Sequence, residues 1–137
     1  MKRTVQSINY RVPYADTDQM AVVYYANYFI YFERIRNEII RHGEYSYKEI
    51  EKLGFMFPVI EAHASYDKPA RYDDELTIKG WFESGRGSAF RMEYSIERDR
   101  EELVSGYTIH CVVNLDGKPR RLPNFLLARI PAPDTLA

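Results

Sequence analysis

Residues 26–42 read ANYFIYFERIRNEIIRH, and this segment decides how the rest of the chain is arranged. Apolar residues recur along it at helical spacing, at Tyr28, Phe32, Ile35 and Ile39. Gly43 then offers a left-handed stop for the predicted helix. Because residues 28–32 are apolar on every face of the predicted helix, we expect this part of the helix to be buried on nearly every side. In a small protein, such a helix must be wrapped by something curved.

The segments outside this helix carry strand patterns. Apolar and polar residues alternate over residues 8–12, 60–66, 76–82, 90–96 and 103–115. Pro13 ends the first strand because proline has no N–H for a ladder. Short links at residues 84–87 and 99–101 predict antiparallel hairpins between consecutive strands. With a second small helix near residues 45–53, the fold class is α+β.

Length and composition limit the possible functions. The chain has 137 residues, of which 45% are hydrophobic, so residues 1–137 predict one domain with a sizeable core. A net charge of -1 argues against a nucleic-acid binder. Cys111 is the only cysteine, which leaves no internal disulfide and no cysteine metal cage. We expect no secretory signal, no membrane span and a cytoplasmic location.

Two carboxylates, Asp16 and Asp18, stand just before the apolar segment in the sequence DTD. One interpretation is structural, because aspartate in a loop commonly caps a helix or forms an Asx-turn. Asp18 lies too far from a helix start near Ala26 to cap it, and Asn27 is the better candidate for the cap.

The other interpretation of DTD is chemical. The first turn of a helix has N–H groups without intrahelical partners and the positive end of the helix dipole, which can polarise a carbonyl. A carboxylate across from that carbonyl can act as nucleophile or as general base for water. These parts suffice to hydrolyse an activated acyl group such as a thioester.

The segment YADTDQMAVVYYANYFIYFERIR, residues 14–36, resembles the signature of the acyl-CoA thioesterase family of the hotdog fold, which includes 4-hydroxybenzoyl-CoA thioesterase and YbgC-type enzymes. PVIEAHASYDKPARYDDELTI, residues 58–78, is similar to the family's second and third strands. The resemblance implies one long helix wrapped by a curved antiparallel sheet. It also implies an acyl-CoA substrate, with coenzyme A as part of the substrate and no separate cofactor.

The resemblance assigns roles to single residues. It implies that Asp18 is the catalytic carboxylate, that Asp16 shapes the loop, and that the backbone amide of Tyr25 polarises the thioester carbonyl. Two positions depart from the family pattern. Ala21 replaces the usual glycine, so the loop must turn with a residue that has a Cβ. Tyr25 replaces the histidine of YbgC-type members and matches the 4-hydroxybenzoyl-CoA branch, and the backbone role survives either change.

Other residues are candidates for binding the substrate. Tyr24, Tyr28 and Phe32 would form a bulky wall that favours short or aromatic acyl groups over long chains. The CoA phosphates need basic residues, for which the candidates are Lys68, Arg71, Arg86, Lys118, Arg120 and Arg121. Each of these is equally explained as a solvated surface charge. The three histidines, His42, His63 and His110, lack metal-ligand spacing, so we expect no metal site, and His110 is expected to be structural or at the surface.

Several alternatives remain open at this point. A non-catalytic acyl-CoA binding protein would share the fold, and a cystatin-like interaction domain would explain the helix and strands but leave DTD without a role. A hotdog dehydratase would need a histidine in the loop before the helix, where this chain has none. Because a curved sheet with one helix leaves strand edges open, we expect a homodimer at least, and a homotetramer by further association.

Overall fold

The computed structural model describes residues 3–131, so residues 1, 2 and 132–137 of the predicted single domain lie outside the described part. The elements in chain order are β1 (Gln6–Arg11), η1 (Tyr14–Asp16), α1 (Asn27–Arg41), α2 (Tyr47–Lys52), β2 (Val59–Tyr66), β3 (Glu75–Arg86), β4 (Ala89–Arg98), β5 (Glu101–Cys111) and α3 (Asn124–Leu127). The predicted α+β class is confirmed, while η1 and α3 had not been predicted. No helix within residues 3–131 has the length and apolar character needed to span a membrane.

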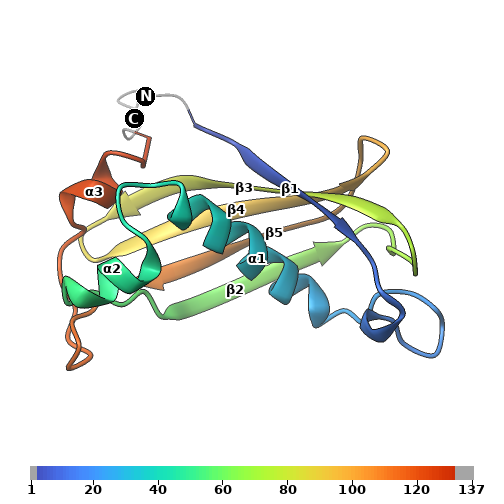
Figure 1. Cartoon of the computed structure of the whole chain (residues 1–137), viewed down its shortest axis with the longest axis horizontal. Helices are drawn as coiled ribbons and strands as arrows, with labels where there is room; N and C mark the ends of the chain where they lie inside the picture. Colours follow the sequence, from blue (N-terminus) through green and yellow to red (C-terminus); the bar gives the residue numbers. More distant parts are fainter. Residues whose placement is uncertain (1–2, 132–137) are drawn as a thin grey trace.

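The five strands form one antiparallel sheet in the order β1-β3-β4-β5-β2. The hairpins β3–β4 and β4–β5 confirm two predicted turns, and Asp99 and Arg100 take positive φ in the second. β2 and β3 follow one another in sequence but are not neighbours, because residues 67–74 carry the chain away from the β2 edge. α1 lies across one face of the sheet, as Figure 1 shows.

The predicted apolar stripe of α1 forms the core against the sheet. Tyr28, Phe32, Ile35 and Ile39 are all buried. The ring of Phe32 stacks on that of Tyr94 with centroids 4.5 Å apart. Gly106 permits this close packing, because a Cβ there would lie 2.6 Å from the Phe32 ring. The helix is therefore packed on the middle of the sheet through Phe32, with no space for a side chain at position 106.

Burial differs from the prediction at one edge of the molecule. Ile30 on α1 is 49% exposed, although burial was expected almost all round residues 28–32, and Ile60 on β2 is 61% exposed. Within residues 3–131, β2 is an edge strand with β5 as its one neighbour, which leaves Ile60 less covered than the apolar residues of the central strands. The last strand is also shorter than predicted: it ends at Cys111, and Val113 continues only as an isolated bridge to Met56 and Pro119.

Candidate active site

The DTD residues form one arm of a small β-ribbon between β1 and α1. The Asp18 N–H donates to the Val22 carbonyl at 2.9 Å, and the Tyr24 N–H donates to the Asp16 carbonyl at 2.9 Å. Between the two arms, Ala21 has a φ of 62°, the left-handed conformation that favours glycine. The loop therefore makes a glycine-type turn even though position 21 has a Cβ.

Asp16 anchors this ribbon to the core. Its Oδ2 accepts hydrogen bonds from the hydroxyls of Tyr10 and Tyr31, each at 2.7 Å. Burial and the Asp16 carboxylate raise the pKa of Tyr31, so that the phenol stays a donor. The Asp16 carbonyl also accepts from the Asn27 side chain at 2.9 Å. The predicted Asn27 cap is therefore wrong: the N-cap residue is Ala26, and the Asn27 amide holds the ribbon instead.

One carboxylate oxygen of Asp18 is hydrogen-bonded within the loop, and the other has no partner within residues 3–131. Its Oδ1 accepts from the Met20 N–H at 2.8 Å, which is the Asx-turn of the structural interpretation. The side chain is exposed, and its Oδ2 has no hydrogen-bond partner among residues 3–131. The structural and chemical interpretations of Asp18 are therefore compatible, because the turn orients the carboxylate without occupying it.

The amide of Tyr25 lies where the ribbon meets α1. Two nearby amides are engaged: the Tyr24 N–H donates to the Asp16 carbonyl, and the Asn27 N–H donates to the Tyr24 carbonyl, each at 2.9 Å. The Tyr25 N–H itself has no acceptor in the part of the chain that the structure describes. It also precedes the N-terminus of a helix of 15 residues, where the macrodipole is positive. A free donor in a positive field is what polarises a carbonyl.

A cavity of about 210 Å³ lies directly beside Tyr25. Its lining residues are Val23, Tyr25, Tyr28, Tyr66, Asp67, Lys68 and Pro69. The buried Tyr28 ring forms its floor, with its hydroxyl accepting from the Ala70 N–H at 3.1 Å. Tyr24 lies outside the cavity, 46% exposed, with its ring 4.8 Å from that of Tyr25. Phe32 is fully buried on Tyr94, so its predicted place in the substrate wall is wrong.

Four cavity residues were not predicted as site residues: Val23, Tyr66, Asp67 and Pro69. Tyr66 ends the alternating pattern of β2, and an Asp-Lys-Pro turn follows it. The alternation shows only that Tyr66 shares a face with Ala64. Its place beside Tyr25 depends on β2 lying at the edge of the sheet, which the sequence pattern does not predict.

The predicted phosphate-binding residues do not all lie together. Lys68 lines the cavity, and its Nζ is 2.8 Å from a carboxylate oxygen of Glu101. Arg71 lies next to the ribbon, because its backbone forms a β-bridge with Val22. The residue is exposed, and its guanidinium has no ion pair within residues 3–131. Both are therefore placed at the same end of the molecule as Asp18.

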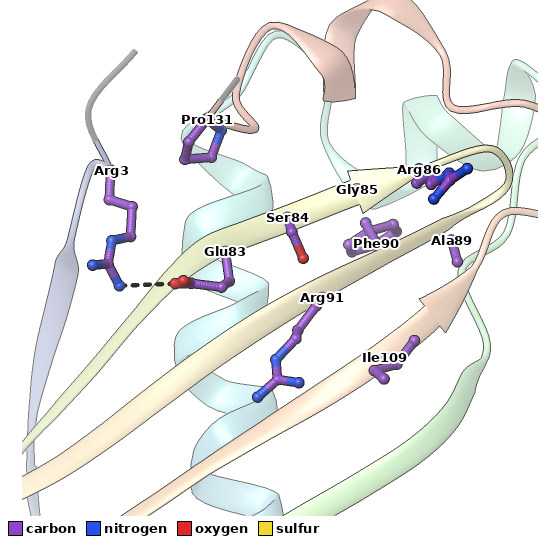
Figure 2. Close-up of a pocket in the computed structure, with 10 residues that line it drawn as sticks. All are labelled: Arg3, Glu83, Ser84, Gly85, Arg86, Ala89, Phe90, Arg91, Ile109 and Pro131. Carbon is purple, nitrogen blue, oxygen red and sulfur yellow. Dashed lines mark hydrogen bonds and ion pairs between the residues drawn. The ribbon is translucent and has the colours of Figure 1, made fainter. Parts of the chain in front are cut away.

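Arg86 lies at the other end of the molecule, on the β3–β4 hairpin (Figure 1). There it borders an open cavity of about 890 Å³ together with Arg3 and Arg91. Figure 2 shows Arg3 reaching Glu83, at 2.8 Å, while Arg86 extends from the hairpin end. Within one chain, Arg86 and Asp18 cannot serve the same site. No group of three or more metal-ligating side chains is arranged around a common point in residues 3–131.

Comparison with known proteins identifies the family of the chain. The sequence profile of the thioesterase-like superfamily matches residues 12–130. The chain belongs to this family. It is 35% identical over 120 residues to the acyl-CoA thioester hydrolase YbgC of Escherichia coli O157:H7, covering 86% of this chain and 90% of the relative. It is 27% identical over 101 residues to 4-hydroxybenzoyl-CoA thioesterase of Pseudomonas sp. strain CBS-3, covering 72% and 71%.

Solved structures give the same result for the fold. The crystal structure of AQ1494, a hypothetical protein from Aquifex aeolicus, superposes with a TM-score of 0.86 at 27% identity, covering 92% of this chain and 99% of that one. The predicted hotdog fold and the class of thioester hydrolase are thereby confirmed, and the cystatin-like alternative is wrong.

Proposed function

We propose that this thioesterase hydrolyses acyl-CoA to a carboxylic acid and free CoA, with Asp18 as the catalytic carboxylate. Two groups near each other in the chain carry the proposal: the Asp18 Oδ2 on the ribbon and the Tyr25 N–H where the ribbon meets α1, neither of which has a partner within residues 3–131. The first supplies a base or nucleophile, and the second supplies an electrophilic donor. Both are positioned by Asp16, which takes no part in the chemistry.

In the proposed reaction, the thioester carbonyl oxygen accepts a hydrogen bond from the Tyr25 N–H. Asp18 either removes a proton from water as the water oxygen attacks the carbonyl carbon, or attacks that carbon itself to give an anhydride that water then cleaves. In both routes the negative charge that develops on the carbonyl oxygen faces the amide and the positive end of the α1 dipole. Collapse breaks the C–S bond, and the CoA thiolate leaves and takes up a proton. The reaction needs no cofactor.

The cavity beside Tyr25 supports a short or aromatic acyl group. Its volume of about 210 Å³ is below the roughly 300–1,000 Å³ of pockets for drug-sized ligands, which favours a small acyl group over a long chain. Tyr25, Tyr28 and Tyr66 supply aromatic surface around this space. The Pseudomonas relative is named for an aromatic acyl-CoA. Tyr24 would contact the substrate at the outer edge of the site.

We propose that Lys68 and Arg71 bind the CoA phosphates. To bind a phosphate, Lys68 would give up its exposed ion pair with Glu101. This costs little, because exposed ion pairs contribute about 0–1 kcal/mol to stability. Arg71 is available without such an exchange. Arg86 would take part only in the site of a second copy of the chain, because of its distance from Asp18 in its own chain.

We propose that the protein is a homodimer at least, and a homotetramer by further association. Support comes from β2, an edge strand whose residues are exposed except for the half-buried Ala64. Its backbone groups on one side have no strand partner within residues 3–131. Val59, Ile60 and the nearby Met56 place apolar surface beside this edge. An apolar, unpaired edge of this kind is what a second copy would cover.

The direct test of the activity is thiol release from a panel of acyl-CoAs, followed with a thiol-reactive dye. The panel contains butyryl-CoA, benzoyl-CoA, hydroxybenzoyl-CoA and palmitoyl-CoA. We expect turnover of the short or aromatic members and the slowest turnover with palmitoyl-CoA. Absence of thiol release from every member, with binding retained, would support the non-catalytic acyl-CoA binding protein instead.

A further inference from the structure

Tyr66 is the last residue of β2 and stands over the cavity beside Tyr25. Its ring centroid lies 5.5 Å from that of Tyr28 and 6.4 Å from that of Tyr25. Tyr66 is 46% exposed, so part of the residue packs on the protein and part is open to solvent. Tyr66 is therefore a wall of the cavity that can contact a bound molecule directly.

The Tyr66 hydroxyl is held more weakly than its neighbours' hydroxyls. It donates to the Tyr25 carbonyl at 3.4 Å, whereas protein O–H···O bonds are usually about 2.7–2.8 Å. The hydroxyls of Tyr10 and Tyr31 are fixed on Asp16 at 2.7 Å, and that of Tyr28 is fixed on the Ala70 N–H at 3.1 Å. Among the cavity-lining tyrosines with a described hydroxyl bond, Tyr66 loses least by turning to another partner.

We propose that Tyr66 is a specificity-determining residue that selects aromatic acyl groups carrying a polar substituent, an inference that rests on the proposed thioesterase function. The ring provides a flat wall for the aromatic acyl group, since offset and edge-on ring contacts are favourable. The hydroxyl leaves the Tyr25 carbonyl and bonds to the substituent on the acyl ring. A cavity of about 210 Å³ has space for a single ring, because an engineered protein cavity of about 150 Å³ already binds benzene.

The expected selectivity is modest, and the structure gives the reason. When the acyl group lacks a polar substituent, the Tyr66 hydroxyl returns to the Tyr25 carbonyl or to water, so no buried polar group is left without a partner. Discrimination by factors of about 10⁴ requires such an unpaired group. The preference for the substituted ring therefore reflects one neutral hydrogen bond exchanged for another, and we expect it to be about tenfold in kcat/KM.

The test compares the wild type with Tyr66→Phe on benzoyl-CoA and on the 2-, 3- and 4-hydroxybenzoyl-CoA isomers. We expect the wild type to prefer one hydroxylated isomer about tenfold in kcat/KM over benzoyl-CoA. Tyr66→Phe should abolish this preference by raising KM for the hydroxylated isomer toward that for benzoyl-CoA, because the hydroxyl that bonds to the substituent is removed. Tyr45→Phe, at the other end of α1, is the matched control and should keep the wild-type preference. Tyr66→Leu should lower kcat/KM for all the aromatic esters relative to butyryl-CoA.

The possible failures can be told apart. If the wild type hydrolyses benzoyl-CoA and the hydroxylated isomers, and Tyr66→Phe retains the wild-type ratio between them, Tyr66 does not determine specificity while the thioesterase function stands. Equal efficiency of the wild type with all four aromatic esters would overturn the inference in the same way. If the wild type releases no thiol from any ester, the proposed function itself fails.

Discussion

At the scale of the residue, the two aspartates of DTD have the same side chain but different surroundings. Asp16 is half-buried and accepts from two tyrosine hydroxyls, whereas Asp18 is exposed and has one oxygen without a partner in residues 3–131. The resemblance had implied a structural role for the first and a catalytic role for the second. The contacts of Asp16 hold the ribbon in place, which the proposed catalytic role of Asp18 requires.

We predict that Asp16→Ala lowers the free energy of unfolding by about 2–3 kcal/mol, since it leaves the Tyr10 and Tyr31 hydroxyls without their acceptor. Asp18→Ala is the matched control and should cost less than about 1 kcal/mol, because it removes one bond at an exposed turn. Urea denaturation followed by circular dichroism measures both. Equal losses in the two variants would show that Asp16 is not the anchor of the ribbon.

Some residue details could be predicted from the sequence and others could not. The position of the carboxylates and of the Tyr25 amide followed from the motif, because they depend on local chain order. The Asn27 cap could not be predicted correctly, since its side chain is drawn to the Asp16 carbonyl across the ribbon. That contact exists only once residues 16–18 have paired with residues 22–24.

At the scale of the element, a buried polar chain lies between α1 and the sheet. The His110 Nδ1–H donates to the Phe57 carbonyl at 3.0 Å, and Nε2 accepts from the Thr108 hydroxyl at 2.8 Å. Thr108 in turn contacts the Tyr94 hydroxyl at 2.6 Å, which accepts from Arg36 at 3.2 Å. A neutral His110 with its proton on Nδ1 satisfies all of these bonds. The sequence had predicted a structural or surface histidine, and the structural alternative is confirmed.

We predict that this chain makes the protein sensitive to mild acid. Burial lowers the pKa of His110 from 6.5 to about 4. Between these values the unfolded chain binds a proton that the folded chain does not, so the free energy of unfolding falls as the pH falls from 6.5 to 4. The full loss is roughly 3 kcal/mol. Denaturant titrations at pH 7, 5.5 and 4.5 measure it.

His110→Gln isolates this contribution, because a glutamine can still bond to Phe57 and Thr108 but does not titrate. Its loss of stability between pH 7 and 4.5 should be smaller than that of the wild type. His63→Gln, at an exposed position on β2, should follow the wild type. An identical pH dependence of the wild type and His110→Gln would refute the assignment to His110.

The elements themselves could be predicted far better than their order. Alternation located β2, β3, β4 and β5, because one face of each was expected to be apolar. Alternation does not say which strands are neighbours, so the sequence missed that β2 pairs with β5 and not with β3. The cavity lining was missed for the same reason, since Tyr66 reaches Tyr25 only from this edge position.

At the scale of the whole molecule, the exposed β2 edge leads to a prediction about assembly. We expect light scattering at micromolar concentration to give the mass of two or four chains. Ile60→Asp should lower the mass toward one chain, because Ile60 is 61% exposed on the edge strand and a charge there opposes pairing. Leu127→Asp, at a similarly exposed apolar position on α3, is the control and should leave the mass unchanged. A monomeric wild type would contradict the proposal.

The assignment of the chemical step to Asp18 is tested by the turnover and the acyl-CoA affinity of Asp18→Asn. The substitution keeps the shape of the side chain and an oxygen for the Met20 N–H, so binding should stay within about threefold of the wild type. Loss of the base or nucleophile should lower kcat by about 10²–10⁴. Asp16→Asn, measured alongside at a temperature where it is folded, should lose less. Wild-type turnover by Asp18→Asn, or a larger loss of kcat in Asp16→Asn, would show that Asp18 does not carry the chemical step.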